Sequence, residues 1–529
     1  MSAYPSIWHP LRHPQFMGLW RSGAIYFVGN AMQAMAAAWM MVEITGSSFL
    51  AALVQTAVFL PMFLLSLPAG VWADITDRRR LILIALVVQA CTGLLLTALA
   101  LTGVAGPATL LILIFISGSC TALLSPAWNS TIGDAIPRDE LPQVITMVSM
   151  AYNGARAIGP ALAGLVFAYA SGAWNFAIAV ASTLVMVHAI RRWPPSTHPP
   201  SRLPPERLWG GMLSALRFAW HSHTVLSQLV RTMAFSGAGS ALWALLPVIS
   251  QRQLGLGPAG FGLLMGCLGT GAVCTGLVVA RVRARLGLEG LVRGGCLLFA
   301  CVMVVAALGR SHVLVYAALF LGGGAWMAVT STFNTATQTS VPPWVRARAV
   351  AMHTLCALGS FALGSALWGA LSDLISLPFS LCLAAASMAV GLLLARPFPL
   401  RMGEAQDVTQ AIPWEDLFIT HEPAPEAGPV AVEIGYRIAS GDAAAFLETI
   451  GHLRAPRRRD GATFWRIYRD LGDLGDSSRF VERFIVTSWA DYLHQRARST
   501  VADHDLEAHV RAFQHEGVPV TMQHYLAER

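Results

Sequence analysis

Residues 81–133, LILIALVVQACTGLLLTALALTGVAGPATLLILIFISGSCTALLSPAWNSTIG, contain no charged side chain. A helix that crosses a bilayer needs about 20 apolar residues, so this run of 53 residues is long enough for two helices. We divide it at the turn-forming residues Gly103, Gly106 and Pro107. The run therefore predicts two successive membrane-spanning helices and a protein that folds in a lipid bilayer.

The composition of the whole chain also indicates a membrane protein. Hydrophobic residues make up 55% of the 529 residues and charged residues 12%, about half the charged share of an ordinary soluble domain. The eight cysteines lie in apolar stretches without metal-ligand spacing, so we expect no disulfide scaffold, no metal site and no cofactor. All 36 basic residues are arginine, which leaves no lysine for a Schiff base or an ATP-binding loop.

Stretches long enough to span a membrane, separated by glycine, proline or charge, occur twelve times. The predicted fold class is an all-α membrane protein with twelve transmembrane helices in two six-helix halves, followed by a smaller α+β domain. The expected spans are 19–42, 49–73, 81–102, 107–131, 142–169, 173–193, 225–249, 258–280, 291–309, 313–337, 349–371 and 377–396.

Charge divides the chain into two parts. Residues 1–403 hold 23 arginines against 9 acidic residues, a balance of +14, whereas residues 404–529 hold 13 against 20, a balance of −7. A proline-rich segment with an amphipathic second half interrupts the spans at 194–224. We therefore expect a first six-helix half (1–193), a cytoplasmic linker with an interfacial helix (194–224), a second half (225–403) and a cytoplasmic α+β domain (404–529).

Arginine is concentrated in alternate loops, and cytoplasmic loops carry the excess of basic residues. One set of loops holds fifteen arginines, the other only Arg252 and Arg310. Both termini are therefore predicted to lie in the cytoplasm of an inner (plasma) membrane, with lipid as a partner. Because the arginines alternate with apolar runs and do not share one soluble face, we expect no nucleic-acid partner. The fifteen are Arg78, Arg79, Arg80, Arg138, Arg191, Arg192, Arg202, Arg207, Arg217, Arg281, Arg283, Arg285, Arg293, Arg346 and Arg348.

The two halves repeat at an offset of 205 residues. This offset superposes six similar pairs, among them Pro137 on Pro342 and Gly159 on Gly364. Duplicated membrane halves enclose a cavity near the bilayer midplane, which opens to either side in turn. The repeat therefore predicts a secondary transporter with a small-molecule substrate.

A candidate cytoplasmic gate lies at residues 70–80, GVWADITDRRR, between the second and third spans. Gly70 allows close helix approach, Asp74 can face a helix N-terminus, and Arg78 can pair with an acid. Asp134, at the cytoplasmic end of the fourth span, is the expected partner of Arg78.

This loop resembles the corresponding loop of the major facilitator superfamily, although Ile75 and Asp77 replace its usual arginine and glycine. Residues 153–166, NGARAIGPALAGLV, resemble the glycine-proline motif that exporters of this superfamily carry in helix five. The alternative for this motif is a close-packed, kinked helix. The motif residues are Gly154, Gly159, Pro160 and Gly164.

With PRDELP at 137–142 and the soluble tail, the whole chain resembles the transmembrane secretion effectors, relatives of enterobactin exporters. The resemblance implies export of a siderophore, drug or secondary metabolite by alternating access and proton antiport, without enzyme activity. The alternatives are uptake of a solute and a membrane-tethered oxygenase that acts through the tail.

Polar residues inside the predicted spans are candidates for the substrate cavity. Arg156 lies ~22 Å along its helix from Leu141, near mid-bilayer, where an unpaired arginine costs about 2.5–3.5 kcal/mol. Asn30 and Gln33 share a helix face, and Gln55 is a candidate neighbour. The alternatives are a clamp on backbone carbonyls for Arg156 and interhelical hydrogen bonds for the amides.

Two charged residues have weaker claims to a site. Glu43, at the outer end of the first predicted span, is the candidate for ion coupling, with an anchor at the membrane surface as the alternative. Arg231 enters the seventh span by about six residues and can extend to the cytoplasmic surface.

The tail from Gly428 onwards changes to strand periodicity. Its predicted order of strand, helix, strand, strand, helix and strand indicates a ferredoxin-like α+β unit, which resembles the antibiotic-biosynthesis monooxygenase superfamily, whose small domains pair into barrels. We expect a regulatory, dimerising or cargo-docking domain; the oxygenase alternative relies on Trp465, Tyr468 and His494. The expected strands are 430–438, 463–468, 480–487 and 518–522, and the helices are 442–453, 489–498 and 503–513.

Overall fold

The computed structural model describes residues 8–134, 136–137, 140–193, 220, 222–341, 343–395, 400, 423–472 and 477–528. For some further residues inside helices it describes only the backbone. Most of the predicted linker 194–224 therefore lies outside the described residues. The C-terminal sheet belongs to a second compact unit, and each unit is described by itself.

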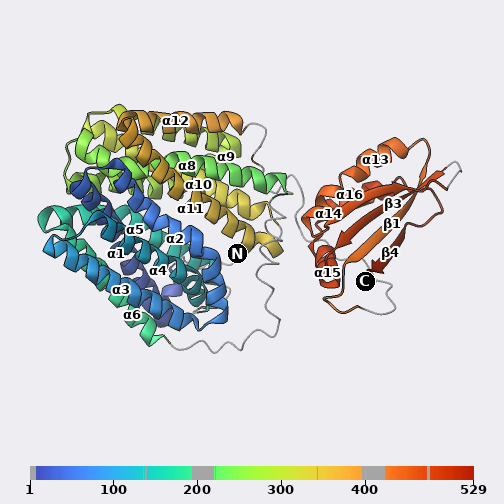
Figure 1. The fold of residues 1–529 in the computed structure, drawn as a ribbon, viewed down its shortest axis with the longest axis horizontal. Coiled ribbons are helices and arrows are strands. Elements are labelled where there is room, and N and C mark those ends of the chain that lie inside the picture. Colours follow the sequence, from blue (N-terminus) through green and yellow to red (C-terminus); the bar gives the residue numbers. More distant parts are fainter. Residues whose placement is uncertain are drawn as a thin grey trace. The chain divides into compact units, whose positions relative to one another are not determined.

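Six long helices form an N-terminal helix group. Helix α1 packs on α2, α5 and α6, while α3 lies against α4 and α6 (Figure 1). Capping explains two helix ends: the Asp77 carboxylate accepts from the first amides of α3, and Gly103 ends that helix with a φ of 71°. After the short helix η1 (His9–Arg12), the group comprises α1 (Pro14–Thr45), α2 (Ser48–Ile75), α3 (Arg78–Thr102), α4 (Pro107–Asp134), α5 (Leu141–Tyr169) and α6 (Gly172–Arg192).

A second series of helices forms a C-terminal helix group. Its longest member has 51 residues, and Gly287 interrupts it with a φ of 69° and a ψ of 173°. The predicted spans 258–280 and 291–309 are the two arms of this helix on either side of Gly287. The group comprises α8 (His223–Val248), the π-helix η3 (Ile249–Gln253), α9 (Pro258–Leu308), α10 (His312–Thr339), α11 (Pro343–Leu374) and α12 (Leu377–Leu394).

The helices carry the apolar surface of a membrane protein. Within the described residues, ten helices are long and apolar enough to cross a bilayer; α9 counts once among them and α5 is not included. Large apolar side chains such as Leu94, Ile112 and Leu363 are more than half exposed, as expected for contact with lipid. The predicted all-α membrane part is confirmed, and the number of twelve spans stays a prediction.

Helices α9 and α10 approach each other at backbone distance. A Cβ atom on Gly323 would lie 1.8 Å from the carbonyl oxygen of Leu268, and one on Gly271 would lie 1.8 Å from that of Phe320. Only glycine fits at either position, because the obstructing atoms belong to the opposite backbone.

The C-terminal domain is a four-stranded antiparallel sheet in the order β2-β3-β1-β4. Alternate residues of β1, from Val430 to Ile438, are buried together with Phe446 of α13 and Val510 of α16. The helices therefore cover one face of the sheet, as Figure 1 shows. The elements follow the predicted order: β1 (Val430–Ala439), α13 (Ala443–Gly451), α14 (Arg454–Arg459), β2 (Phe464–Arg469), β3 (Ser477–Val486), α15 (Trp489–Arg498), α16 (Val501–Arg511) and β4 (Thr521–Leu526).

The contact between α9 and α10 predicts opposite effects for two glycine substitutions. Gly323→Ala should lower the stability of the purified protein in detergent by about 1–3 kcal/mol, because the new methyl group meets a carbonyl oxygen. The control Gly294→Ala, on an exposed site of α9 with no atom within 4 Å of its Cβ, should raise stability by ~0.5–1 kcal/mol. Thermal unfolding measures both, and equal shifts would contradict the packing described here.

Candidate functional site

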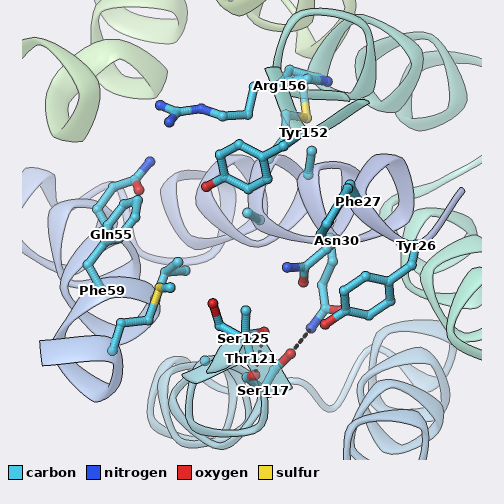
Figure 2. Close-up of a pocket in the computed structure, with 18 of the residues that line it drawn as sticks. Tyr26, Phe27, Asn30, Gln55, Phe59, Ser117, Thr121, Ser125, Tyr152 and Arg156 are labelled. Carbon is cyan, nitrogen blue, oxygen red and sulfur yellow. Dashed lines mark hydrogen bonds between the residues drawn. The ribbon is translucent and has the colours of Figure 1, made fainter. Parts of the chain in front are cut away.

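A cavity of about 480 Å³ lies between the two helix groups. Helices α1, α2, α4 and α5 form most of its wall, and Trp243, Phe261, Met265 and Phe361 contribute from α8, α9 and α11. Figure 2 shows Arg156 and Tyr152 on one side and Ser117, Thr121 and Ser125 on the other. The polar lining residues are Tyr26, Asn30, Gln33, Gln55, Ser117, Thr121, Ser125, Asn129, Ser149, Tyr152 and Arg156.

Arg156 projects from α5 into this cavity. Its guanidinium carbon lies 5.9 Å from the ring centre of Tyr152 and 5.4 Å from that of Trp243 on α8. Among the described residues, no carbonyl or carboxylate is bound to the Arg156 guanidinium. Cation-π contacts therefore take the place of the carbonyl clamp that the sequence left as an alternative.

The amides of α1 join a buried hydrogen-bond network at the opposite wall. The Tyr26 hydroxyl donates to Gln89 Oε1 at 2.9 Å, and Gln89 Nε2 donates to Asn30 Oδ1 at 3.4 Å. Gln33 Nε2 donates to Ser117 Oγ at 3.2 Å. Asn30 and Gln33 thus make interhelical hydrogen bonds and also line the cavity, and Gln55 lines it from α2. That a substrate contacts these residues stays a prediction.

Two glycines of the helix-five motif lie at close helix contacts. A Cβ on Gly159 would lie 2.7 Å from Ala31 Cβ on α1, and one on Gly164 would lie 2.9 Å from the Cα of Gly262 on α9. Pro160 lines the cavity, whereas Gly154 has no atom within 4 Å of its Cβ position. Packing accounts for Gly159 and Gly164, and a role of the motif in export stays a prediction.

Helices α2 and α11 are joined by a carboxylate at the N-terminus of α2. Asp373 accepts from Ser47 Oγ at 2.6 Å, from the Ser48 amide at 2.8 Å and from the Phe49 amide at 3.0 Å. A negative charge is stabilised at this end of a helix because unpaired amides point outwards there. Further along the same two helices, Thr56 Oγ1 donates to the Ala362 carbonyl at 2.9 Å.

The sequence did not anticipate Asp373, since the expected span ended at residue 371. The signal that it leaves in the sequence is an acid just beyond the end of an apolar run; the helix start that it caps lies more than 300 residues away in the chain. Glycines such as Gly262 and Gly269 of α9, which meet α5 at backbone distance, were also missed although residues 255–276 are visibly glycine-rich.

The structure says little about the predicted cytoplasmic gate. For Gly70, Asp74 and Asp134 the structure describes only the backbone, so the pairing of Asp134 with Arg78 lies outside what it describes. Arg78 is the first residue of α3 and is partly buried. The gate therefore stays a prediction.

Glu43 and Arg231 both lie away from the cavity lining. Glu43 is exposed near the end of α1 and accepts from Trp39 Nε1 at 2.6 Å. Arg231 is buried, donates to both carboxylate oxygens of Glu289 at 3.0 Å, and donates to the Ala395 carbonyl at 2.9 Å. Arg231 therefore fastens α8 to α9 and to the end of α12.

Comparison with known proteins identifies the family. The sequence matches the family described as Transmembrane secretion effector over residues 5–529. This chain belongs to that family. The multidrug efflux pump Tap of Mycobacterium tuberculosis is 25% identical to this secretion effector over 378 residues, which cover 68% of this chain and 88% of Tap. The enterobactin exporter EntS of Citrobacter koseri is 25% identical over 423 residues, or 76% and 95% of the two chains.

Solved transporter structures share the fold of this secretion effector. A variant of the nucleoside transporter NupG superposes with a TM-score of 0.61 at 13% identity, over 73% of this chain and 99% of NupG. The D-xylose-proton symporter superposes with a TM-score of 0.60 at 13% identity, over 74% and 99%. The chain is thus an integral membrane transporter of the major facilitator type, and its family is not an enzyme family.

The two membrane arginines should respond differently to truncation. Arg231→Ala should lower the stability of the detergent-purified protein by about 3 kcal/mol, because it breaks the buried ion pair with Glu289, which keeps only Arg293, and leaves the Ala395 carbonyl without its donor. Arg156→Ala should change it by less than ~1 kcal/mol, the value of an exposed cation-π contact. Thermal unfolding of both variants measures the difference, and an equal loss would mean that Arg156 is structural.

Proposed function

We propose that this secretion effector exports a small organic molecule through the 480 Å³ cavity by alternating access. The observation that carries the proposal is the position of the cavity between two helix groups, with Arg156 of α5 and Trp243 of α8 on its wall. Its volume lies in the range of about 300–1,000 Å³ that small-molecule sites occupy. The names of Tap and EntS, an efflux pump and an exporter, support the outward direction.

The lining favours an aromatic cargo that carries acidic or hydrogen-bonding groups. Arg156 supplies a positive charge, Tyr152, Trp243 and Phe361 supply ring faces, and Asn30 belongs to a cluster of amides and hydroxyls at the opposite wall. Siderophores, drugs and secondary metabolites combine these features. We propose Arg156, Asn30, Gln33 and Gln55 as substrate contacts.

Alternating access is supported by where the two helix groups meet. Asp373 joins α11 to the start of α2, and Gly164 meets Gly262 of α9 near the end of α5. At the other end of α5, the cavity-lining residues Ile145 and Ser149 are exposed. We propose that the termini lie in the cytoplasm, as the arginine distribution predicts, and that this arrangement is an inward-facing state of an inner-membrane protein, closed on the outside by Asp373.

We further propose twelve crossings, because α5 and the second arm of α9 complete the ten apolar helices. Gly70, Asp74, Arg78 and Asp134 are proposed as the inner gate that closes when the outer contact opens. Coupling to protons belongs to the same proposal, with Glu43 as the candidate carboxylate.

The C-terminal domain is proposed to be ferredoxin-like and regulatory, without catalysis. Its uncovered sheet face carries Tyr468 and Tyr525, which are 46% and 47% exposed. This face supports pairing of two copies as the alternative role.

Removal of the transporter should raise the intracellular level of its cargo. Untargeted metabolite analysis of cells with and without the protein should find at least one aromatic metabolite that accumulates severalfold in the deletion strain. Arg156→Ala should reproduce that accumulation at normal protein level, because it removes the cationic contact. The control Arg310→Ala, in the exposed loop between α9 and α10, should restore export. A metabolite that falls on deletion would indicate uptake and contradict the proposal.

Loss of the Asp373 contact should favour the outward-open state. In a cysteine-free background, Asp373→Ala should increase severalfold the labelling of a Gln55→Cys side chain by a membrane-impermeant maleimide added outside, because α2 loses a carboxylate cap of about 0.5–2 kcal/mol. Asp373→Asn keeps one acceptor oxygen and should give a smaller increase. Unchanged labelling in both variants would show that this contact does not hold the outer side closed.

A further inference from the structure

The C-terminal domain contains a second cavity, of about 290 Å³, between the helix-covered face of its sheet and helices α14, α15 and α16. Its wall is largely aromatic and aliphatic, and Met522 of β4, 47% exposed, lies at its edge. This volume is at the lower limit for small-molecule sites, so it suits a molecule of one or two rings. The apolar and aromatic lining includes Ile434, Tyr436, Leu453, Phe484, Tyr492 and Met522.

Several charged groups of this cavity form ion pairs with one another or with residues just behind its wall. Arg457 Nε donates to Glu482 at 3.1 Å and its Nη1 lies 2.7 Å from Glu507. Burial opposes ionisation of Asp503, yet the Arg459 guanidinium, 2.5 Å away, holds the pKa of that carboxyl below its ordinary value. Three arginines and three acids line the cavity, so its formal charge is balanced and favours a neutral ligand. They are Arg457, Arg496, Arg511, Asp460, Asp503 and Glu507.

One buried polar atom in the lining has no partner. Gln495 is 6% exposed, and its Nε2 donates to the Arg457 carbonyl at 3.2 Å. That carbonyl only accepts, which fixes the orientation of the amide and leaves Gln495 Oε1 without a donor among the described residues. A buried acceptor without a donor costs about 1–3 kcal/mol, and a donor on a ligand in the cavity would remove this cost.

The neighbouring polar groups are occupied with each other. The Tyr492 hydroxyl lies 2.5 Å from His524 Nε2. Burial, together with the charge of Arg496, lowers the pKa of His524, so its imidazole is neutral near pH 7. Gln495 is therefore the acceptor that this group of side chains leaves open to a ligand.

We propose that the C-terminal domain binds a neutral aromatic molecule whose hydroxyl or amine group donates to Gln495 Oε1. The site is built entirely from residues 434–524, and it does not depend on the proposed transport direction. It gives the cytoplasmic domain a ligand of its own.

The hydrogen bond to Gln495 can be tested with two probes that differ in one donor. Binding of 2-naphthol and of 2-methoxynaphthalene to the full-length protein in detergent is measured by equilibrium dialysis, with protein-free detergent as the reference. Wild-type protein should bind 2-naphthol saturably and about tenfold more tightly than the methyl ether, the value of one buried hydrogen bond. Gln495→Leu should bind both probes equally.

Matched variants locate the site. Gln523→Leu makes the same change of residue type on the face of β4 that points away from the cavity, where the side chain is exposed, and should bind both probes like the wild type. Arg156→Ala, in the transport cavity, should also bind both probes like the wild type. Met522→Trp should weaken binding of both probes because its larger side chain fills the cavity. This variant tests the location of the site even if Gln495→Leu fails to fold. Three outcomes would overturn the proposal: the wild type binds both probes equally, Arg156→Ala abolishes binding, or no binding is saturable.

Discussion

The hydrocarbon layer offers no hydrogen-bond partner, and this constraint determines where polar groups lie in the secretion effector. Backbone groups are satisfied within long helices. Arg231 is buried because Glu289 and the Ala395 carbonyl satisfy it, and Asn30 belongs to a network that links α1, α3 and α4. Arg156, which makes no such bond among the described residues, projects into the cavity. Arg156 is therefore a polar group that the helices do not bond internally and that the cavity exposes.

Two of the contacts between the helix groups, α5 with α9 and α2 with α11, differ in chemistry. Between α5 and α9, small residues such as Gly164 and Gly262 bring backbones into contact, and the described residues form no ion pair there. Between α2 and α11, Asp373 caps a helix and Thr56 bonds a carbonyl. Close backbone packing allows helices to roll or slide with little electrostatic cost, whereas a capped helix end is either bonded or free. In the proposed alternating-access cycle, the α2–α11 contact would break and re-form, while the α5–α9 contact would slide.

Much of the fold follows from the sequence because lipid imposes a simple local rule. Apolar runs of about 20 residues gave helix positions to within a few residues for most spans, and the change to strand periodicity from Gly428 indicated the sheet that begins at Val430. Arg156 was identifiable because a charged side chain inside an apolar run costs free energy in the bilayer unless it has a partner or faces a cavity. Asp373, Glu289 and Gln495 were not, since their importance depends on partners far away in the chain. No local pattern encodes which helix end faces Asp373 or which carbonyl takes the amide of Gln495.

The position of the Arg156 guanidinium has a consequence for how cargo and conformation are linked. It rests on the rings of Tyr152 from α5 and Trp243 from α8, so it bridges the two helix groups through π faces alone. In the proposed function, an aromatic cargo that inserts above the guanidinium would replace the indole of Trp243 with its own ring face, at nearly equal energy. Cargo binding would then break the contact between Arg156 and Trp243 that joins the two helix groups. Without cargo, this contact would keep the two groups together.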